Sequence, residues 1–340
     1  MQVLIMGGTR FLGKFIVETL VRHGYGVTSV NIDENASSRL PPGVESIFCN
    51  RKDHAKLRGA LDGRRFDAVL DIGNAPTLPE DIAVVLDSVG PALKRYVFCS
   101  TSTVYKKPIV IFPTTEDHPV DGGSRPYTQN KLKCEEFLFE RFRRDGTPIT
   151  IIRPRHIYGP ESYEYREGFF FDRLTRDRPV FIPGEGSLIT QFGYVEDTAE
   201  SFRLAIERDE AVGQAYTITG KECITFNAYV DLLGKVTGRN VKKIYFDPKL
   251  LEKFDKPGLS LGESLHSLKT NSHICYDIGK AKEQLGYVPR FSLEEGLRKA
   301  YQWYLETGGN TYVKRVMNFE LEDEFLRLVT AASGSITGRP

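Results

Sequence analysis

The first 24 residues restrict the possible fold more than any other stretch of the chain. Residues 2–6 (QVLIM) are an almost unbroken apolar run, typical of a parallel strand that is buried on both faces. A glycine-rich turn follows directly, and then Leu12, Ile16 and Leu20 recur at the spacing of one helix face until Gly24. The start of such a helix binds anions, because its free N–H groups and positive dipole end point outward. We therefore expect a strand–turn–helix unit that binds the pyrophosphate of a dinucleotide.

The turn, GGTRFLG, departs at one place from the ideal dinucleotide motif. Gly7 or Gly8 allows a tight turn, and Gly13 allows the helix to pack closely. Arg10 stands where a middle glycine would let the pyrophosphate approach. Taken alone, the motif also fits a plain structural turn. The residues that we expect to line the cofactor here are Gly7, Gly8, Thr9, Arg10, Phe11, Leu12 and Gly13.

The first half of the 340-residue chain alternates short apolar runs with helical patterns. After the first strand we expect strands at 27–31, 46–48, 67–72, 96–100 and 149–152, and helices at 53–61, 79–89 and 126–143. This alternation predicts an α/β fold, a Rossmann-type doubly wound parallel sheet. Ligands of such sheets bind beyond the carboxyl ends of the strands.

The rhythm loosens from Arg153 onward, where loops rich in Gly, Pro and aromatic residues interrupt shorter helices. We expect a dinucleotide-binding domain of residues 1–160, to which residues 190–215 return. Residues 161–330 would form a smaller, mixed α/β substrate domain that is interleaved with the first. A last helix is expected at 320–330, followed by a frayed tail.

Composition argues against several classes of protein. The formal net charge of +1 gives no general attraction for nucleic acid or membranes, although a local basic patch is compatible with it. No apolar run approaches the ~18 residues that span a bilayer. Five scattered cysteines without a C-x-x-C pair predict reduced thiols and a cytoplasmic protein. The histidines show no metal-ligand spacing, so no metal site is expected.

Tyr127 and Lys131 lie four residues apart, and hence on one face of a predicted helix. A phenol ionises near pKa ~10, and a nearby ammonium favours the phenolate and lowers that value. Thr101 follows a predicted strand and could hydrogen-bond the same substrate oxygen. The Tyr–Lys pair alone also fits an ordinary surface helix. In this order after a nucleotide turn, the three residues predict an acid–base site.

These motifs resemble the extended short-chain dehydrogenase/reductase family of nucleotide-sugar epimerases and dehydratases. The matching pieces span residues 1–300 and comprise GGTRFLG, STSTVY at 100–105, Tyr127-x-x-x-Lys131, RPRHIYGP at 153–160, YVED at 194–197 and KAKEQLG at 280–286. The resemblance implies that Tyr127 is the acid/base, that Lys131 orients the nicotinamide ribose, and that Thr101 completes the triad. It implies an NAD-dependent epimerase of nucleotide-diphosphate sugars, in which hydride leaves a sugar carbon and returns on the other face.

Departures from the family pattern limit the choice of reaction. Dehydratases of the family carry Asp-Glu directly after the triad Thr, whereas this chain has Ser102 and Thr103. An epimerase is therefore favoured over a 4,6-dehydratase or decarboxylase, unless Glu116 or another acid supplies a base, and a reductase of the same family is a further alternative. His156 and Gln191 stand where many members have Asn and Arg against the sugar diphosphate. The expected substrate contacts are Ser102, Thr103, Arg155, His156, Arg173 and Gln191.

The choice between NAD and NADP rests on the end of the second strand. An acidic residue there normally holds the adenosine ribose, but this chain has Asn31, with Asp33 two residues later. Asp33 could serve, which favours NAD, while Arg10 or Arg39 could accept the 2′-phosphate of NADP. The residues expected beside the adenosine are Asn31, Asp33, Asn50 and Arg51.

A second resemblance is to the chloroplast stem-loop-binding branch of the same family, whose members have been associated with RNA. It rests on GGTRFLG, FFDRL at 170–174, RDRP at 176–179 and TQFGYV at 190–195. It implies that Arg173, Arg176 and Arg178 contact phosphates, but the balanced overall charge favours a solvated or diphosphate-facing loop. By analogy with the family we also expect a homodimer through the helices at 79–89 and 126–143, whose apolar positions fit a sheet-facing core equally well.

Overall fold

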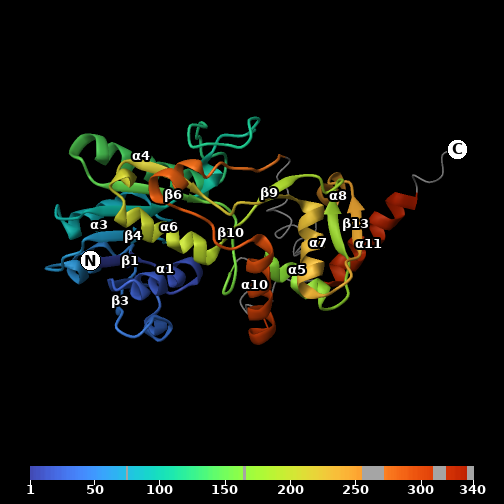
Figure 1. Ribbon diagram of the computed structural model, residues 1–340, viewed down its shortest axis with the longest axis horizontal. Helices are drawn as coiled ribbons and strands as arrows, with labels where there is room; N and C mark the ends of the chain where they lie inside the picture. The colour runs from blue at the N-terminus through green and yellow to red at the C-terminus, as the bar shows by residue number, and fades with distance from the viewer. Residues whose placement is uncertain (74–75, 164–165, 255–271, 309–318, 335–340) are drawn as a thin grey trace. The chain divides into compact units, whose positions relative to one another are not determined.

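The computed structural model describes residues 1–73, 76–163, 166–254, 272–308 and 319–334 of the chain (Figure 1). The chain divides into two compact units. Unit 1 comprises Met1–Ile157, Gln191–Glu222 and Cys275–Ser292, and unit 2 comprises Tyr158–Thr190, Cys223–Ile274 and Leu293–Pro340. Residues 191–222 thus belong with the N-terminal part, and so do residues 275–292, which the sequence alone places in the second domain.

Unit 1 is built on a seven-stranded parallel sheet with the strand order β11-β6-β5-β4-β1-β2-β3. The strands are β1 (Gln2–Met6), β2 (Gly26–Asn31), β3 (Glu45–Phe48), β4 (Ala68–Asp71), β5 (Arg95–Cys99), β6 (Ile149–Pro154) and β11 (Gln214–Ile218). The predicted Rossmann-type sheet is confirmed, and β11 is a strand that the sequence patterns do not reveal. The strand order reverses between β1 and β4, which is the place where such sheets bind dinucleotides.

Helices cover both faces of this sheet. On one face, α1 (Phe11–Arg22) packs beside α6 (Val195–Glu207), and on the other α3 (Pro79–Val89) packs beside α4 (Pro126–Asp145) and α2 (His54–Leu61) (Figure 1). Because the sheet is covered on both faces, the side chains of Val3, Leu4 and Ile5 are all completely buried, as the apolar run predicts. The shorter helical turns of unit 1 are η1 (Glu34–Arg39), η2 (Ser102–Val104), η3 (Asp209–Ala211) and η4 (Ala281–Leu285). In addition, β7 (Ile157–Tyr158) pairs with β10 (Gly193–Tyr194) in a short two-stranded sheet.

The apolar residues of α3 lie inside unit 1. Ile82, Val85, Leu86 and Val89 are all buried and belong to one hydrophobic cluster with the strands. Their apolar character is therefore explained by the fold of the single chain, and they give no support to the predicted dimer.

Unit 2 is a smaller assembly of helices and two-stranded pairs around an aromatic core. Its strands are β8 (Val180–Pro183) paired with β13 (Lys243–Phe246), and β9 (Ile189–Gln191) paired with β12 (Cys223–Thr225). Its helices are α5 (Glu167–Leu174), α7 (Phe226–Thr237), α8 (Lys249–Lys253), α10 (Leu293–Thr307) and α11 (Phe319–Gly334). Rings such as Phe181, Phe246 and Phe325 pack at centroid distances of 5.2–6.4 Å. The last helix runs past the predicted end at 330 into the stretch expected to be frayed.

The cysteines are of two kinds. Cys49, Cys99 and Cys134 are free and buried. Cys223 and Cys275 are disulfide-bonded, so the prediction of five reduced thiols is wrong for these two. Among the described helices, none has both the length and the apolar character needed to cross a bilayer.

Candidate functional site

The glycine turn after β1 has the shape of a phosphate cradle. Gly7 adopts a φ of +95°, which favours glycine, and a Cβ on Gly13 would collide with the carbonyl oxygen of Gly7. The first turn of α1 therefore packs directly on the turn. Helix α1 begins without a side-chain cap from Arg10 and without an acidic residue in its first turn. Its positive end is thus suited to a pyrophosphate, and the geometry fits a dinucleotide.

The other residues of the turn differ in exposure. Thr9, Phe11 and Leu12 are buried, whereas Arg10 is exposed at the start of the helix. Phe11 takes a φ of +39°, a value unusual for a side chain of its size. The departure from the ideal motif at Arg10 therefore leaves the close glycine packing of the turn intact.

The acidic group at the end of β2 belongs to Asp33. Asn31 is buried, and its amide donates to the Ser29 carbonyl at 3.2 Å and the Ser46 hydroxyl at 3.4 Å. Asp33 accepts from the backbone N–H of Asn35 and forms an ion pair with Arg39 at 2.9 Å. The carboxylate that would hold a ribose and the cation that would accept a 2′-phosphate are therefore each other's partners.

Arg51 is buried inside the protein. Its guanidinium donates to both carboxylate oxygens of Asp71, at 2.7 and 2.8 Å, and to the Thr77 hydroxyl at 3.2 Å. Burial alone would raise the pKa of Asp71, but the Arg51 charge lowers it below its ordinary value. This placement does not agree with a direct contact between Arg51 and the adenine. Neighbouring Asn50 uses its side chain to accept from the backbone N–H of Lys52 at 3.0 Å.

Helix α4 brings Lys131 to the end of β5. The Lys131 ammonium donates to the Cys99 carbonyl at 2.6 Å and lies 4.7 Å from the ring centroid of Phe98. The same Nζ atom is 5.9 Å from the ring centroid of Tyr127, so the two side chains share a helix face as their spacing predicts. Lys131 is buried, and Tyr127 is 47% exposed. A ligand can therefore reach the phenol while the ammonium stays fixed behind it.

A chain of hydroxyl groups connects Thr101 to the same helix. Thr101 Oγ1 accepts from the backbone N–H of Thr103 at 3.2 Å and lies 3.0 Å from Thr103 Oγ1. Thr103 Oγ1 in turn lies 3.2 Å from Thr128 Oγ1, and Thr128 directly follows Tyr127. The start of α4 is thus joined to the segment after β5 at two points, which brings the predicted triad to one strand end. Sequence reasoning misses Thr128, because no pattern marks it.

A buried ion pair supports this arrangement from behind. Arg153 of β6 donates to both oxygens of Glu135 on α4, at 3.1 and 2.6 Å, and the Ser100 hydroxyl donates to the same carboxylate. The pair therefore joins α4 to β5 and β6. The position of Glu135 four residues after Lys131, on the same helix face, is a signal that could have indicated this link.

Gln191 stabilises backbone rather than offering a free amide. Its Nε2 donates to the Gly220 carbonyl at 2.8 Å, and its Oε1 accepts from the backbone N–H of Tyr276 at 2.8 Å. Gln191 is buried. Because both ends of the amide are used, the structure gives no support to a diphosphate contact by this side chain.

The remaining predicted substrate residues of unit 1 are buried or partly buried. Ser102 is almost completely buried, and its carbonyl accepts from the Tyr276 hydroxyl at 3.3 Å. Arg155 is buried, and His156 takes a φ of +34° with its ring centroid 5.7 Å from that of Phe192. Their roles toward a substrate stay predictions.

Glu116, the alternative source of a base, is held by the backbone. Its Oε1 accepts from the N–H of Thr217 in β11 at 2.6 Å. This bond fixes the carboxylate at the edge of the sheet, and it makes Glu116 a structural acceptor.

Arg173 lies in unit 2 and has no exposed surface. Its guanidinium forms an ion pair with Glu322 of α11, donates to the Phe169 carbonyl at 2.7 Å and lies 3.0 Å from the Phe169 ring centroid. Burial lowers the pKa of the guanidinium, and Glu322 opposes that change. Because these partners already surround Arg173, the structure gives no support to its predicted contacts with a substrate or with RNA phosphates.

The two neighbouring arginines are also paired with carboxylates. Arg176 donates to Asp172 at 2.6 Å, and Arg178 forms an ion pair with Asp323. The basic run at 173–178 is therefore neutralised within unit 2. Across the described residues, no group of His, Cys, Asp or Glu is arranged to hold a metal ion.

Comparison with known proteins gives consistent matches. Residues 3–219 match the model of the NAD dependent epimerase/dehydratase family. The chloroplast stem-loop binding protein of 41 kDa b of Arabidopsis thaliana is 31% identical over 96% of this chain and 84% of its own length. A putative UDP-glucose 4-epimerase of Methanocaldococcus jannaschii is 25% identical over 89% of this chain and 98% of its own length.

Solved structures agree in fold. The UDP-glucose 4-epimerase of Thermotoga maritima, solved with UDP-glucose, superposes with a TM-score of 0.75 at 24% identity, over 91% of this chain and 100% of that one. The dTDP-glucose 4,6-dehydratase of Bacillus anthracis, solved in complex with NAD, superposes with a TM-score of 0.74 at 16% identity, over 93% of this chain and 100% of that one. At these identities the match shows the fold alone.

Proposed function

Because the chain belongs to the NAD dependent epimerase/dehydratase family, we propose that it is an NAD-dependent epimerase of a nucleotide sugar. The observation that carries the proposal is the placement of Lys131 and Tyr127 at the end of β5, with the Thr101 hydroxyl joined to the same helix. The glycine turn lies at the same carboxyl edge of the sheet, two strands away. A dinucleotide on that turn would extend toward the triad.

The roles of the three side chains follow from their chemistry. When bound, NAD supplies the hydride acceptor. Tyr127 takes the proton of the sugar hydroxyl, and Thr101 hydrogen-bonds the same oxygen. Lys131 presents a buried ammonium 5.9 Å from the Tyr127 ring, which favours the phenolate. Lys131 is also the group that would bind the nicotinamide ribose.

The site favours epimerisation over dehydration or decarboxylation. Those two reactions need a further acid or base at the sugar, and the positions after Thr101 hold the hydroxyls of Ser102 and Thr103. Glu116 is held by the Thr217 amide. An epimerase needs only the triad and a sugar that turns over in the site, so the residues present are sufficient for it.

The test is turnover of UDP-glucose, UDP-glucuronate and dTDP-glucose, followed by NMR of the sugar products. We expect the C4 epimer from one of them and a loss of about a thousandfold in Tyr127→Phe, with unchanged NAD affinity. Equal turnover in Tyr127→Phe would rule out this base. A released keto-deoxy or unsaturated sugar would instead identify a dehydratase.

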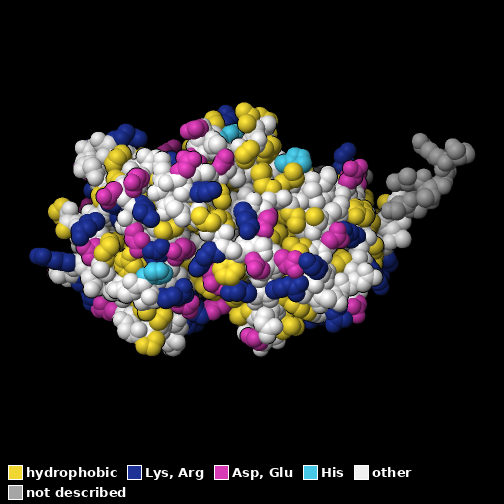
Figure 2. All heavy atoms as spheres, viewed as in Figure 1, with side chains coloured by type: hydrophobic (Ala, Val, Ile, Leu, Met, Phe, Trp, Pro, Cys, Tyr) yellow, Lys and Arg dark blue, Asp and Glu magenta, His cyan; other side chains and the backbone are white. Residues whose placement is uncertain are grey.

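A second candidate function is RNA binding, which the Arabidopsis stem-loop binding relative supports. The structure provides little for it, because Arg173, Arg176 and Arg178 are paired with carboxylates. On the face shown in Figure 2, basic and acidic side chains are also intermixed. The test is stem-loop RNA affinity at about 50 mM salt and its fall with rising salt. Absence of binding at low salt would dispose of this candidate.

A further inference from the structure

The buried ion pair between Arg51 and Asp71 lies at the carboxyl end of β4, next to the point where the strand order reverses. Gly7 follows β1 and Gly73 lies just beyond β4, and these two strands are neighbours. A Cβ on Gly7 would be 3.6 Å from both the Cα and the N atom of Gly73, an ordinary van der Waals distance, so Gly73 lines the turn beside Gly7. A group that fixes Gly73 therefore fixes one wall of the glycine turn.

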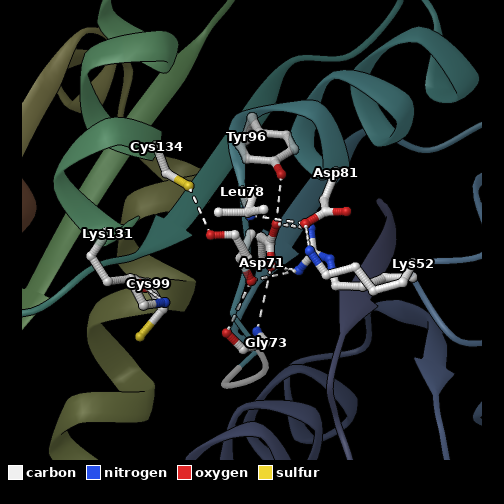
Figure 3. A network of polar contacts seen from close by, with 11 residues as sticks. Lys52, Asp71, Gly73, Leu78, Asp81, Tyr96, Cys99, Lys131 and Cys134 are labelled. Atoms are coloured by element: carbon white, nitrogen blue, oxygen red, sulfur yellow. Dashed lines mark hydrogen bonds and ion pairs between the residues drawn. The ribbon is translucent and has the colours of Figure 1, made fainter. Parts of the chain in front are cut away.

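The ion pair holds Gly73 in this place (Figure 3). The backbone N–H of Gly73 donates to Asp71 Oδ1 at 3.4 Å. A Cβ on Gly73 would be only 2.8 Å from Arg51 Nη1 and 3.6 Å from the Thr77 hydroxyl. The guanidinium thus packs against Gly73, and a side chain at this position would have to push it away from its present place.

Further bonds connect the pair to β5 and to the helix of the triad. The Tyr96 hydroxyl of β5 donates to Asp71 Oδ2 at 2.7 Å. Arg51 donates to the Thr77 hydroxyl, and the Cys134 thiol donates to the Thr77 carbonyl at 3.3 Å. Cys134 lies one helical turn beyond Lys131 on α4. One continuous set of contacts therefore runs from the glycine turn to the helix that carries Tyr127 and Lys131.

Stability alone does not explain why a charged pair occupies this position. Two ions buried this deeply lose their hydration, and an apolar pair of similar volume is often as stable or more stable. An apolar pair would lack the directed bonds to Gly73 and Thr77. Those bonds, rather than the attraction between the charges, distinguish the pair from hydrophobic packing.

We propose that Arg51 and Asp71 are positioning residues, which hold Gly73 against Gly7 and thereby set the affinity of the glycine turn for the dinucleotide. The inference rests on the proposed function, since it requires that the chain binds NAD. Arg51 then contributes to cofactor binding through Gly73, and not by touching the adenine.

The test is NAD affinity by isothermal titration calorimetry, with unfolding by urea measured alongside. Arg51→Met is expected to weaken NAD binding by about tenfold or more. Loss of a residue that orients the groups in contact with a ligand typically lowers affinity by about this factor. Arg51→Lys keeps the charge without the paired donors, and it should fold and show an intermediate loss. The double variant Arg51→Met with Asp71→Leu should regain stability, since no buried charge is left alone, but should not regain affinity.

Arg173→Met is the matched control, because it breaks a similarly buried ion pair in unit 2. It should lower stability and leave NAD affinity unchanged below the unfolding transition. The inference would be overturned if NAD affinity recovered together with stability in the double variant. It would also be overturned if Arg51→Lys bound NAD as tightly as the wild type, and in both cases the proposed function would stand. A wild-type chain that binds neither NAD nor NADP would overturn both.

Discussion

Lys131 in unit 1 and Arg173 in unit 2 are both buried cations, but their partners differ in kind. The Lys131 ammonium contacts the Cys99 carbonyl and the faces of Phe98 and Tyr127, and within the described part of the chain it forms no ion pair. The Arg173 guanidinium is paired with Glu322. A cation with no carboxylate in direct contact keeps its charge for a ligand, whereas one matched by a carboxylate contributes mainly to the fold. The partners of a buried cation therefore indicate its role better than its burial does.

The largest expected effect is that of Lys131→Met on turnover. This change keeps the packing over Phe98 but removes the charge beside Tyr127, so kcat should fall by about a thousandfold with little loss of stability. Steady-state kinetics on the nucleotide sugar that the wild type converts, together with thermal unfolding, would measure both. Exposed Lys133 on the same helix provides the control, since Lys133→Met should change neither. A large loss of stability with normal kcat would reverse the role assigned to Lys131.

Arg173→Met should show the opposite behaviour. Removing the guanidinium takes away the nearest charged partner of the buried Glu322 and leaves it with Arg178 Nε at 3.8 Å, so the free energy of unfolding should fall by about 3 kcal/mol. The double variant Arg173→Met with Glu322→Leu should recover most of this, because the buried carboxylate is removed as well and Arg178 keeps Asp323 as its partner. Urea unfolding of the three proteins measures the effect. Turnover of the folded single variant should equal that of the wild type, and a strong loss of turnover would return Arg173 to the substrate site.

The buried cations Lys131, Arg51 and Arg173 show how much of the structure can be predicted from the sequence. The fold follows from it, because apolar runs and helix-face spacing are local signals, and the spacing of Tyr127 and Lys131 similarly places both on one helix face. The roles of Arg51 and Arg173 do not follow, because their partners Asp71 and Glu322 are 20 and 149 residues away. A basic run such as 173–178 resembles a phosphate site until the fold brings carboxylates to it.

Thr103→Val tests whether the neutral hydroxyl groups around the triad affect turnover as much as the charge of Lys131 does. The change keeps the shape but breaks the hydroxyl chain between Thr101 and Thr128. Thr101 then loses one hydrogen bond that orients it, so kcat should fall by about fivefold, the value of a single such bond. Thr103→Ser retains the hydroxyl and should behave like the wild type. If the Val and Ser variants have the same kcat, the hydroxyl chain has no part in orienting Thr101.

The smallest effect is expected at the half-exposed pair of Asp33 and Arg39 on the surface of unit 1. This pair allows the comparison between a paired and an unpaired cation to be made at an exposed site. Here a carboxylate partner keeps Arg39 from a 2′-phosphate, with 2.9 Å between the charged atoms. Asp33→Asn should release Arg39 and remove a charge that repels the 2′-phosphate. The ratio of NADP to NAD affinity should therefore rise by about threefold, a small factor because exposed ion pairs are weak. Titration of the folded protein with each dinucleotide measures the ratio, and Glu34→Gln removes a neighbouring charge as the control. An equal change for both dinucleotides would mean that Asp33 does not face the adenosine ribose, and that cofactor choice is made elsewhere on the turn.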